Sequence, residues 1–357
     1  MAAVKTAEKK AKTAPVAVVS FKPKELVNSL LSVLPERSRI VLESRFGIGK
    51  SPERHTLEAI GGRYGITRER VRQIENHAIA LIHKAPAFAN AQAAFNELEA
   101  IIHSLGGIVN EEDLLASISK DEHVQNYIHF LLVLGDPFKY RKEDEAMYRC
   151  WYVDPKLAAQ VEDSLHNLFK GLSDDELVAE GEMIDRFLEE LKEISDKYRN
   201  EEVMRRWLSL SKHIGKNPLG EWGPAHSPNV KTKGIRDFAY LAVKKHGSPL
   251  HFTEVADMIA KMFDRAAHVA TTHNELIKDD RFVLVGRGMY ALKEWGYTAG
   301  VVRDVIREVL RKYGPLTREE IVDKVLKERH VKEGTIMVNL QNSKYFKKNK
   351  DGKWVAV

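Results

Sequence analysis

The stretch TLEAIGGRYGITRERVRQIENHAIALIHK, residues 56–84, contains the signals for two short helices separated by a tight turn. Thr56 begins a run with helical spacing that extends to about Arg63, and Thr67, a favoured N-cap residue, precedes a second run. Gly65 stands between the two runs, where a residue with positive φ ends the first helix. The pattern therefore predicts a helix from Thr56, a turn, and a longer helix that extends to Lys84.

Two more helical segments precede this stretch. KELVNSLLSVL, residues 24–34, has apolar residues at the 3.6-residue period of a helix. PERSRIVLESRFG, residues 35–47, has proline at its start and glycine just past its end, which is the usual asymmetry of helix termini. Residues 21–85 are therefore predicted to be short helices whose last two have the helix-turn-helix layout.

The second helix of this pair has a polar face in its first two turns, opposite the apolar one: Arg68, Glu69, Arg72 and Gln73. In helix-turn-helix proteins the start of the second helix enters the DNA major groove. There arginine can bind guanine, glutamine can bind adenine, and glutamate can accept from cytosine. Thr67 and Arg70 are better placed for phosphates. The alternative is a solvated face with i,i+4 pairs, but an Arg68–Arg72 pair would be repulsive, so the pattern favours DNA contact.

The combination of PERSRIVLESRFG with HTLEAIGGRYGITRERVRQIENHAIALI resembles the fourth conserved region of primary bacterial sigma factors, over about residues 34–84. That region is the helix-turn-helix that binds the promoter −35 element. The resemblance implies DNA base contacts from Arg68, Glu69 and Gln73. It implies contacts with the phosphate backbone from Arg37, Arg45, Leu57, Glu58, Thr67, Arg70 and Arg72. The rest of the chain has no counterpart of the aromatic, basic helix that melts the −10 element, so autonomous promoter opening is not expected.

An internal repeat follows residue 85. Three segments share a helix, a glycine turn and a capped acidic-apolar helix: LGGIVNEEDLLASI (105–118), HGSPLHFTEVADMI (246–259) and YGPLTREEIVDKVL (313–326). A pair of strand-like runs with a turn follows each of them, at residues 138–153, 281–295 and 345–357. Three helices closed by a β-hairpin make a winged helix. The predicted fold is mainly α: a sigma region 4-like helix-turn-helix followed by winged-helix units, which are three-helix bundles with β-hairpin wings.

The middle copy carries a second resemblance. GIRDFAYLAVKKHGSPLHFTEVADMIAKMF and FVLVGRGMYALKEWGY, within residues 234–297, are similar to the HARE-type helix-turn-helix, a winged-helix module. That module also occurs in the delta subunit of some bacterial RNA polymerases. The outer copies, 90–153 and 298–357, are predicted from the repeat pattern alone. The remaining segments are expected to be a basic flexible tail (1–20), an acidic helical segment (154–214) and a Gly- and Pro-rich linker (215–233).

The formal net charge of the 357-residue chain is +5, but the charge is unevenly distributed. Segment charges are +3 for 1–20, +5 for 21–85, −6 for 86–153, −7 for 154–200, +4 for 201–297 and +6 for 298–357. A polyanion would be attracted to the two ends and repelled by the middle. Near the C-terminus, lysines cluster around one predicted turn. They are either phosphate contacts, from Lys347, Lys348 and Lys350, or a charged sheet edge that prevents aggregation.

The sequence offers no catalytic or metal-binding pattern. A single cysteine, Cys150 in MYRCWYV, cannot form an internal disulfide and is expected to be buried and structural. SRFGIGKS, residues 44–51, lacks the first glycine and the preceding strand of a phosphate-binding loop. No apolar run reaches the length of a membrane span. We therefore expect a cytoplasmic, nucleoid-associated protein that is not an enzyme, with no cofactor, metal or small-molecule substrate.

Two functional hypotheses remain open. In the first, the chain is a transcription regulator that binds double-stranded DNA, together with the RNA polymerase core. In the second, it is a polymerase accessory protein of the delta-subunit kind, in which the acidic middle contacts basic polymerase surface and DNA binding is secondary. A third hypothesis, a DNA-modifying enzyme, has little support, because no residues of this sequence can be assigned to an active site.

Overall fold

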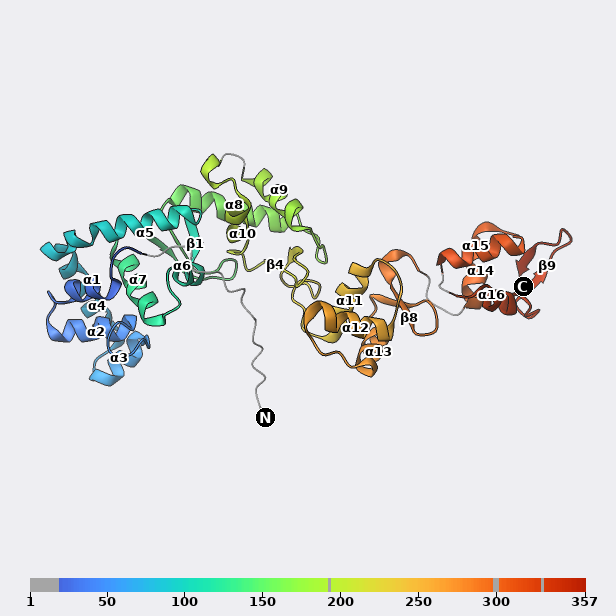
Figure 1. Cartoon of the computed structure of the whole chain (residues 1–357), viewed down its shortest axis with the longest axis horizontal. Coiled ribbons are helices and arrows are strands. Elements are labelled where there is room, and N and C mark those ends of the chain that lie inside the picture. Colours follow the sequence, from blue (N-terminus) through green and yellow to red (C-terminus); the bar gives the residue numbers. More distant parts are fainter. Residues whose placement is uncertain (1–18, 192–193, 298–301, 329–330) are drawn as a thin grey trace. The chain divides into compact units, whose positions relative to one another are not determined.

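The computed structural model describes residues 19–191, 194–297, 302–328 and 331–357 (Figure 1). Residues 1–18 of the expected basic tail lie outside these ranges. The chain divides into two compact units: Met1–Ser173 with Glu180–Gly215, and Asp174–Ala179 with Lys216–Val357.

The first unit begins with the helices α1 (Pro23–Leu31), α2 (Glu36–Phe46), α3 (Leu57–Tyr64) and α4 (Arg68–Lys84). The expected cap at Thr67 is present, because Thr67 Oγ1 accepts from the Arg70 amide at 3.2 Å. Thr56 caps α3 in the same way, since its Oγ1 accepts from the Ala59 amide at 3.1 Å. Gly65 ends α3 in the left-handed conformation, at φ 64°. Local sequence signals thus set both ends of the turn between α3 and α4.

The first repeat copy follows in the same unit. Its elements are η1 (Pro86–Ala91), α5 (Gln92–Ser104), β1 (Ile108–Asn110), α6 (Glu111–Ile118), α7 (Glu122–Leu134), β2 (Lys139–Arg141) and β3 (Cys150–Tyr152). The three strands form an antiparallel sheet in the order β1-β3-β2, in which Val109 pairs with Trp151 and Trp151 with Tyr140. Cys150 is buried, and burial raises the pKa of its thiol to about 12. Cys150 is therefore a structural residue whose thiol is unreactive.

The acidic segment completes the first unit with α8 (Pro155–Lys170), α9 (Glu180–Glu190), η2 (Asp196–Tyr198) and α10 (Glu201–Leu208). Each helix buries one apolar stripe, with Phe187 and Trp207 fully enclosed and their rings 6.5 Å apart. The carboxylates stay on the outer faces, several in i,i+4 pairs such as Arg186 with Glu182.

Residues 215–233 carry more structure than the linker that their Gly and Pro content suggests. They include most of the hairpin β4 (Ile214–Lys216) and β5 (Trp222–Pro224). Trp222 is buried, and its backbone exchanges two hydrogen bonds of 2.8 Å with Val178. Ser227 and Asn229 are also buried.

The second repeat copy comprises α11 (Ile235–His246), β6 (Leu250–His251), α12 (Phe252–Phe263), α13 (Val269–Lys278), β7 (Phe282–Leu284), β8 (Met289–Leu292) and η3 (Lys293–Trp295). Its antiparallel sheet has the order β6-β8-β7, which matches that of the first copy. The third copy comprises α14 (Val302–Tyr313), α15 (Arg318–Glu328), α16 (Glu333–Leu340), β9 (Phe346–Lys348) and β10 (Trp354–Ala356). A single bridge, Leu316 to Trp354, replaces the first strand there.

Each repeat copy therefore has three helices and a terminal β-hairpin, in the predicted order. The second and third copies each have their own core, centred on residues such as Val243 and Ile259 in one and Val309 and Ile336 in the other. All sheets among the described residues are short and antiparallel. The predicted fold class, mainly α with helix-turn-helix and hairpin-closed helical units, is confirmed. No described helix combines the length and apolar character that a membrane crossing requires.

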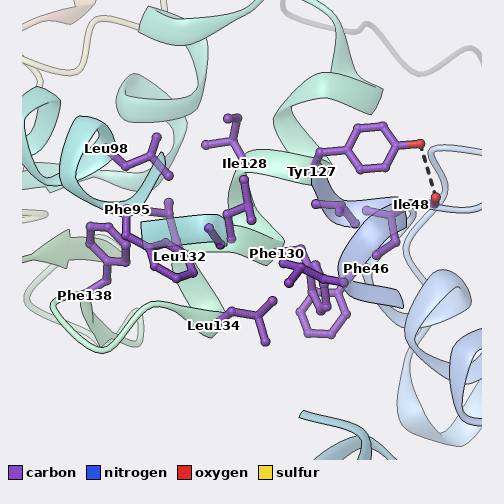
Figure 2. Packing of buried hydrophobic residues seen from close by; sticks show 14 of the residues in the cluster. Phe46, Ile48, Phe95, Leu98, Tyr127, Ile128, Phe130, Leu132, Leu134 and Phe138 are labelled. Carbon is purple, nitrogen blue, oxygen red and sulfur yellow. Dashed lines mark hydrogen bonds between the residues drawn. The ribbon is translucent and has the colours of Figure 1, made fainter. Parts of the chain in front are cut away.

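The helix-turn-helix and the first repeat copy share one hydrophobic core. Its buried residues come from α1, α2 and α4 on one side and from α5 and α7 on the other. Figure 2 shows Phe46 of α2 against Phe130 of α7, with ring centres 4.9 Å apart. The Tyr127 hydroxyl donates to the Ile48 carbonyl at 3.3 Å. A smaller cluster of Val41, Ile60 and Val71 holds α2, α3 and α4 together.

Candidate nucleic-acid interface

The first two turns of α4 present an exposed polar face. Five of the proposed contact residues are exposed there: Arg68, Glu69, Arg70, Arg72 and Gln73. Val71, between them in sequence, is fully buried against Ile60 and Val41. The helix therefore offers polar side chains to solvent while its opposite face is fixed in the core.

These side chains pair mainly at i,i+3 spacing, while the i,i+4 neighbour Gln73 also hydrogen-bonds Glu69 and helps to lower its pKa. Arg72 donates to both carboxylate oxygens of Glu69, at 2.9 and 2.7 Å. This hydrogen bonding lowers the pKa of Glu69, so its carboxylate is ionised at neutral pH. Arg70 Nη1 donates to Gln73 Oε1 at 3.1 Å. Arg68 has no ion-pair partner within the described part of the chain.

The pairing has a consequence for DNA contact. Glu69 can accept a hydrogen bond from DNA only through the lone pairs that Arg72 and Gln73 leave free. The Gln73 amide oxygen accepts from Arg70, and its NH2 group is shared with Glu69. Both pairs are exposed, so exchanging them for DNA groups costs little. The side chains of this face are therefore held in place by each other in the free protein, and they can still exchange these contacts for contacts with DNA.

A hollow of 280 Å³ lies beside this face, between the start of α2 and the middle of α4. Its lining includes Arg37, Ser38, Arg70, Gln73 and His77. The hollow thus brings together two of the expected phosphate contacts, Arg37 and Arg70, with one expected base contact. Sequence reasoning missed Ser38 and His77, although His77 lies one helical turn after Gln73 and could have been found from that spacing.

Arg45 lies in a different environment from Arg37. Its Nε atom is 3.6 Å from Glu75 Oε1, and its Nη1 atom donates to the His55 carbonyl at 3.2 Å. The Glu75 side chain is only 14% exposed, and burial raises its pKa while Arg45 offsets part of that effect. The expected phosphate contact therefore also links α2, α4 and the loop before α3.

The remaining expected contacts lie at the helix starts. Thr67 uses its hydroxyl oxygen to cap α4, which leaves the hydroxyl proton for a phosphate oxygen. Glu58 is exposed in the first turn of α3, whereas Leu57 is half-buried and packs against the Val41–Ile60–Val71 cluster. Leu57 is therefore only partly available to a partner, whereas the Glu58 side chain is exposed.

The sequence comparison identifies this same part of the chain. Residues 30–83 match the protein family described as Sigma-70, region 4. Residues 30–83 are a Sigma-70 region 4 domain. The resemblance seen over 34–84 is thereby confirmed, whereas the HARE-type resemblance of 234–297 stays a prediction.

Three relatives illustrate how far the similarity extends. RNA polymerase principal sigma factor HrdD of Streptomyces coelicolor is 35% identical over 77 residues, which are 22% of this chain and 23% of that protein. HrdD of Streptomyces viridifaciens is 37% identical over 67 residues, 19% of this chain and 20% of that protein. RNA polymerase sigma factor RpoD of Helicobacter pylori is 46% identical over 56 residues, 16% of this chain and 8% of that protein. The chain thus covers less than a quarter of the length of these relatives.

The region 4 domain is held from outside by α7. Asn126 is buried; it accepts from Arg54 Nε at 2.6 Å and donates to the carbonyls of Gly47 and Pro52 at 3.0 and 2.7 Å. His123 Nε2 lies 3.0 Å from the Gly49 carbonyl. The loop between α2 and α3 is therefore fastened to the first repeat copy at several backbone atoms.

Proposed function

We propose that this protein is a DNA-binding transcription regulator in which α4 of the region 4 domain recognises promoter −35-type DNA. The observation that carries the proposal is the exposed polar face of α4, set on a buried apolar face. Base contacts are assigned to Arg68, Glu69 and Gln73, whose side chains suit guanine, cytosine and adenine. Phosphate contacts are assigned to Arg37, Thr67, Arg70 and Arg72, which position the helix without reading sequence.

RNA polymerase is the second proposed partner. The support is the similarity of residues 30–83 to a domain found in sigma factors, so the proposal extends to transcription initiation only through that domain. We assign no catalytic role, cofactor or small-molecule substrate. The competing role is that of a delta-subunit-like accessory protein, and it depends on a HARE-type identity for residues 234–297. Winged helices in general share the order of elements found there, α11, β6, α12, α13, β7 and β8, so that order does not favour this role.

Selection from a randomised-site DNA library tests the first proposal, with the full chain and its variants. Glu69→Ala or Gln73→Ala should relax preference at one base pair, at a cost of about 1–3 kcal/mol for the preferred base. Arg37→Ala should weaken binding to all sequences alike. It should also reduce the salt slope, which is the steepness with which the logarithm of the binding constant falls with the logarithm of the salt concentration, by about one. Arg37 is the better phosphate control than Arg45, because Arg45 also supports the fold.

The opposite result would show that α4 is not docked in this way. If Arg37→Ala reorders the preferred sites while Glu69→Ala and Gln73→Ala leave the order unchanged, the assignment of base contacts is wrong. Absence of any selected sequence, with binding that depends only on salt, would favour the accessory role instead.

A further inference from the structure

The three repeat copies have wings of different charge. Between β2 and β3 the first copy carries three consecutive acidic residues, Glu143 to Glu145. Between β7 and β8 the second copy has VGRG, with a single arginine. Around β9 and β10 the third copy has five lysines, Lys344, Lys347, Lys348, Lys350 and Lys353, against one aspartate. The wing is therefore acidic in the first copy, nearly neutral in the second and strongly basic in the third.

In the first copy the third helix is buried against the region 4 domain, and the exposed wing is acidic and contacts another part of the same unit. Its third helix, α7, packs on the region 4 domain, and Asn126, Tyr127 and Phe130 are buried there. Its wing is fastened to the chain after α10, since Lys212 Nζ lies 2.6 Å from Glu143 Oε1 and donates to the Asp144 carbonyl at 2.7 Å. This copy is a scaffold.

The wing of the third copy has the opposite character. All five lysines are exposed, and none forms an ion pair with another residue that the structure describes. The hairpin itself is firmly built: Phe346 is buried in the core, and Lys348 pairs with Trp354, whose ring lies 5.3 Å from the Lys348 ammonium group. The hairpin therefore carries a row of exposed lysines that form no salt bridge among the described residues, although the charge of Lys353 helps to lower the pKa of Glu320.

We propose that the β9–β10 hairpin binds the phosphate backbone of duplex DNA without sequence preference. The inference rests on the proposed function, because this second contact would act together with α4 on one DNA molecule. Two binding modules on one chain make the second contact intramolecular, which raises overall affinity without any new base reading.

The arrangement of the lysines favours DNA over an acidic protein or bare solvent. Lysine is a compact charge on a flexible stem, so a row of lysines can meet regularly spaced phosphates without matched geometry. A charged edge that only prevents aggregation needs its charges on the free strand, β9. Here Lys350 lies in the turn and Lys353 lies next to the paired strand β10. The charge surrounds the whole hairpin.

The test measures the salt dependence of binding to a short duplex that lacks any selected site, with the full chain. Lys347→Gln with Lys350→Gln removes two wing charges; Lys324→Gln with Lys327→Gln removes two charges from α15, where Lys327 is paired with Asp323 at 2.8 Å. The wing variant should reduce the salt slope by about two, so that its loss of affinity relative to the wild type shrinks about tenfold between about 50 and about 200 mM salt. The α15 variant should leave the slope unchanged.

Equal slopes for the two variants would overturn the proposal, since net charge alone would then account for binding. An unchanged slope with a new tendency to aggregate would show that the lysines only protect the edge. The selected site preference reports on the proposed function separately, because the wing variant should leave it unaltered. If Gln73→Ala fails to change preference while the wing slope still falls, the assignment of α4 fails and the wing proposal stands.

Discussion

At the scale of single residues, Arg45 shows how one side chain can belong to both a DNA-facing surface and the fold. Its side chain is 37% exposed, while the side chain of its partner Glu75 is 14% exposed. Removing the arginine leaves a mostly buried carboxylate without its counter-charge, which is costlier than losing an exposed ion pair.

We predict that Arg45→Ala lowers the free energy of unfolding by about 1–3 kcal/mol at about pH 7. Burial already raises the pKa of Glu75 above its ordinary 4.5, and loss of Arg45 should raise it further. A carboxyl with a raised folded pKa is destabilising when ionised, and the cost is relieved as the pH falls through that pKa. The deficit relative to wild type should therefore shrink toward about pH 5, as measured by urea unfolding across pH.

The double variant Arg45→Ala with Glu75→Gln provides the control for this prediction. It has no carboxylate to protonate, so it should be more stable than Arg45→Ala at neutral pH and should show no such pH dependence. A deficit in Arg45→Ala that is constant with pH would mean that lost packing, and not the charge on Glu75, is responsible.

Asn126 is the second residue whose role is set by distant contacts. Its side chain satisfies two carbonyls and one guanidinium group of the α2–α3 loop, 72 to 79 positions earlier in the chain. Asn126→Ala should cost about 1–3 kcal/mol of stability, because these buried groups lose their partner. Amide hydrogen exchange should rise selectively in the loop after Gly47.

Gln92→Ala is the matched control, because it removes an amide side chain that makes one exposed hydrogen bond, to Asn96 at 2.9 Å. Its effect should stay within about 0.5 kcal/mol of the wild type. Similar losses in the two variants, or unchanged exchange in the loop, would contradict the role of Asn126 as a clamp.

At the scale of secondary-structure elements, local signals predicted the helices well. Thr56, Gly65 and Thr67 act on their immediate neighbours, so the sequence alone places the turn of the helix-turn-helix. The hairpins are equally local, since each follows from two short apolar runs around a turn. The pairing on the surface of α4 is also local, but it depends on side-chain rotamers that the sequence does not specify, and the i,i+3 pairs were not predicted.

The partner of α7 could not be predicted from the sequence. Its sequence, EHVQNYIHFLLVL, has a broad apolar face and a polar stripe at Glu122, Gln125, Asn126 and His129, so the pattern predicts one buried face. The structure also buries Asn126 on the polar side. A local pattern cannot show which element packs on this side of α7, because the contact with the end of α2 joins residues more than 70 positions apart in the chain. The hairpin within 215–233 was missed for a related reason, since Gly and Pro mark turns without saying what lies between them.

At the scale of the whole molecule, the region 4 domain is not an independent folding unit in this chain. Its core residues Leu30, Leu42 and Ile82 belong to the cluster that also contains Phe95 and Phe130 of the first repeat copy. Cutting the chain after α4 would expose this apolar surface to water. Burial of a single side chain of that size contributes about 1.5–3 kcal/mol, so several exposed at once would exceed the stability of a small domain.

We therefore predict that a fragment of residues 1–85 is largely unfolded, whereas a fragment of residues 1–215 folds cooperatively and keeps the site preference of the full chain. Circular dichroism and urea unfolding measure the first property, and selection from the randomised library measures the second. The longer fragment retains α5, α7 and the helices that pack behind them, and so leaves the shared core intact. A cooperatively folded 1–85 fragment with the same preference would show that α7 is dispensable. In that case the contacts of Asn126, Tyr127 and Phe130 would fix the orientation of the region 4 domain without stabilising it.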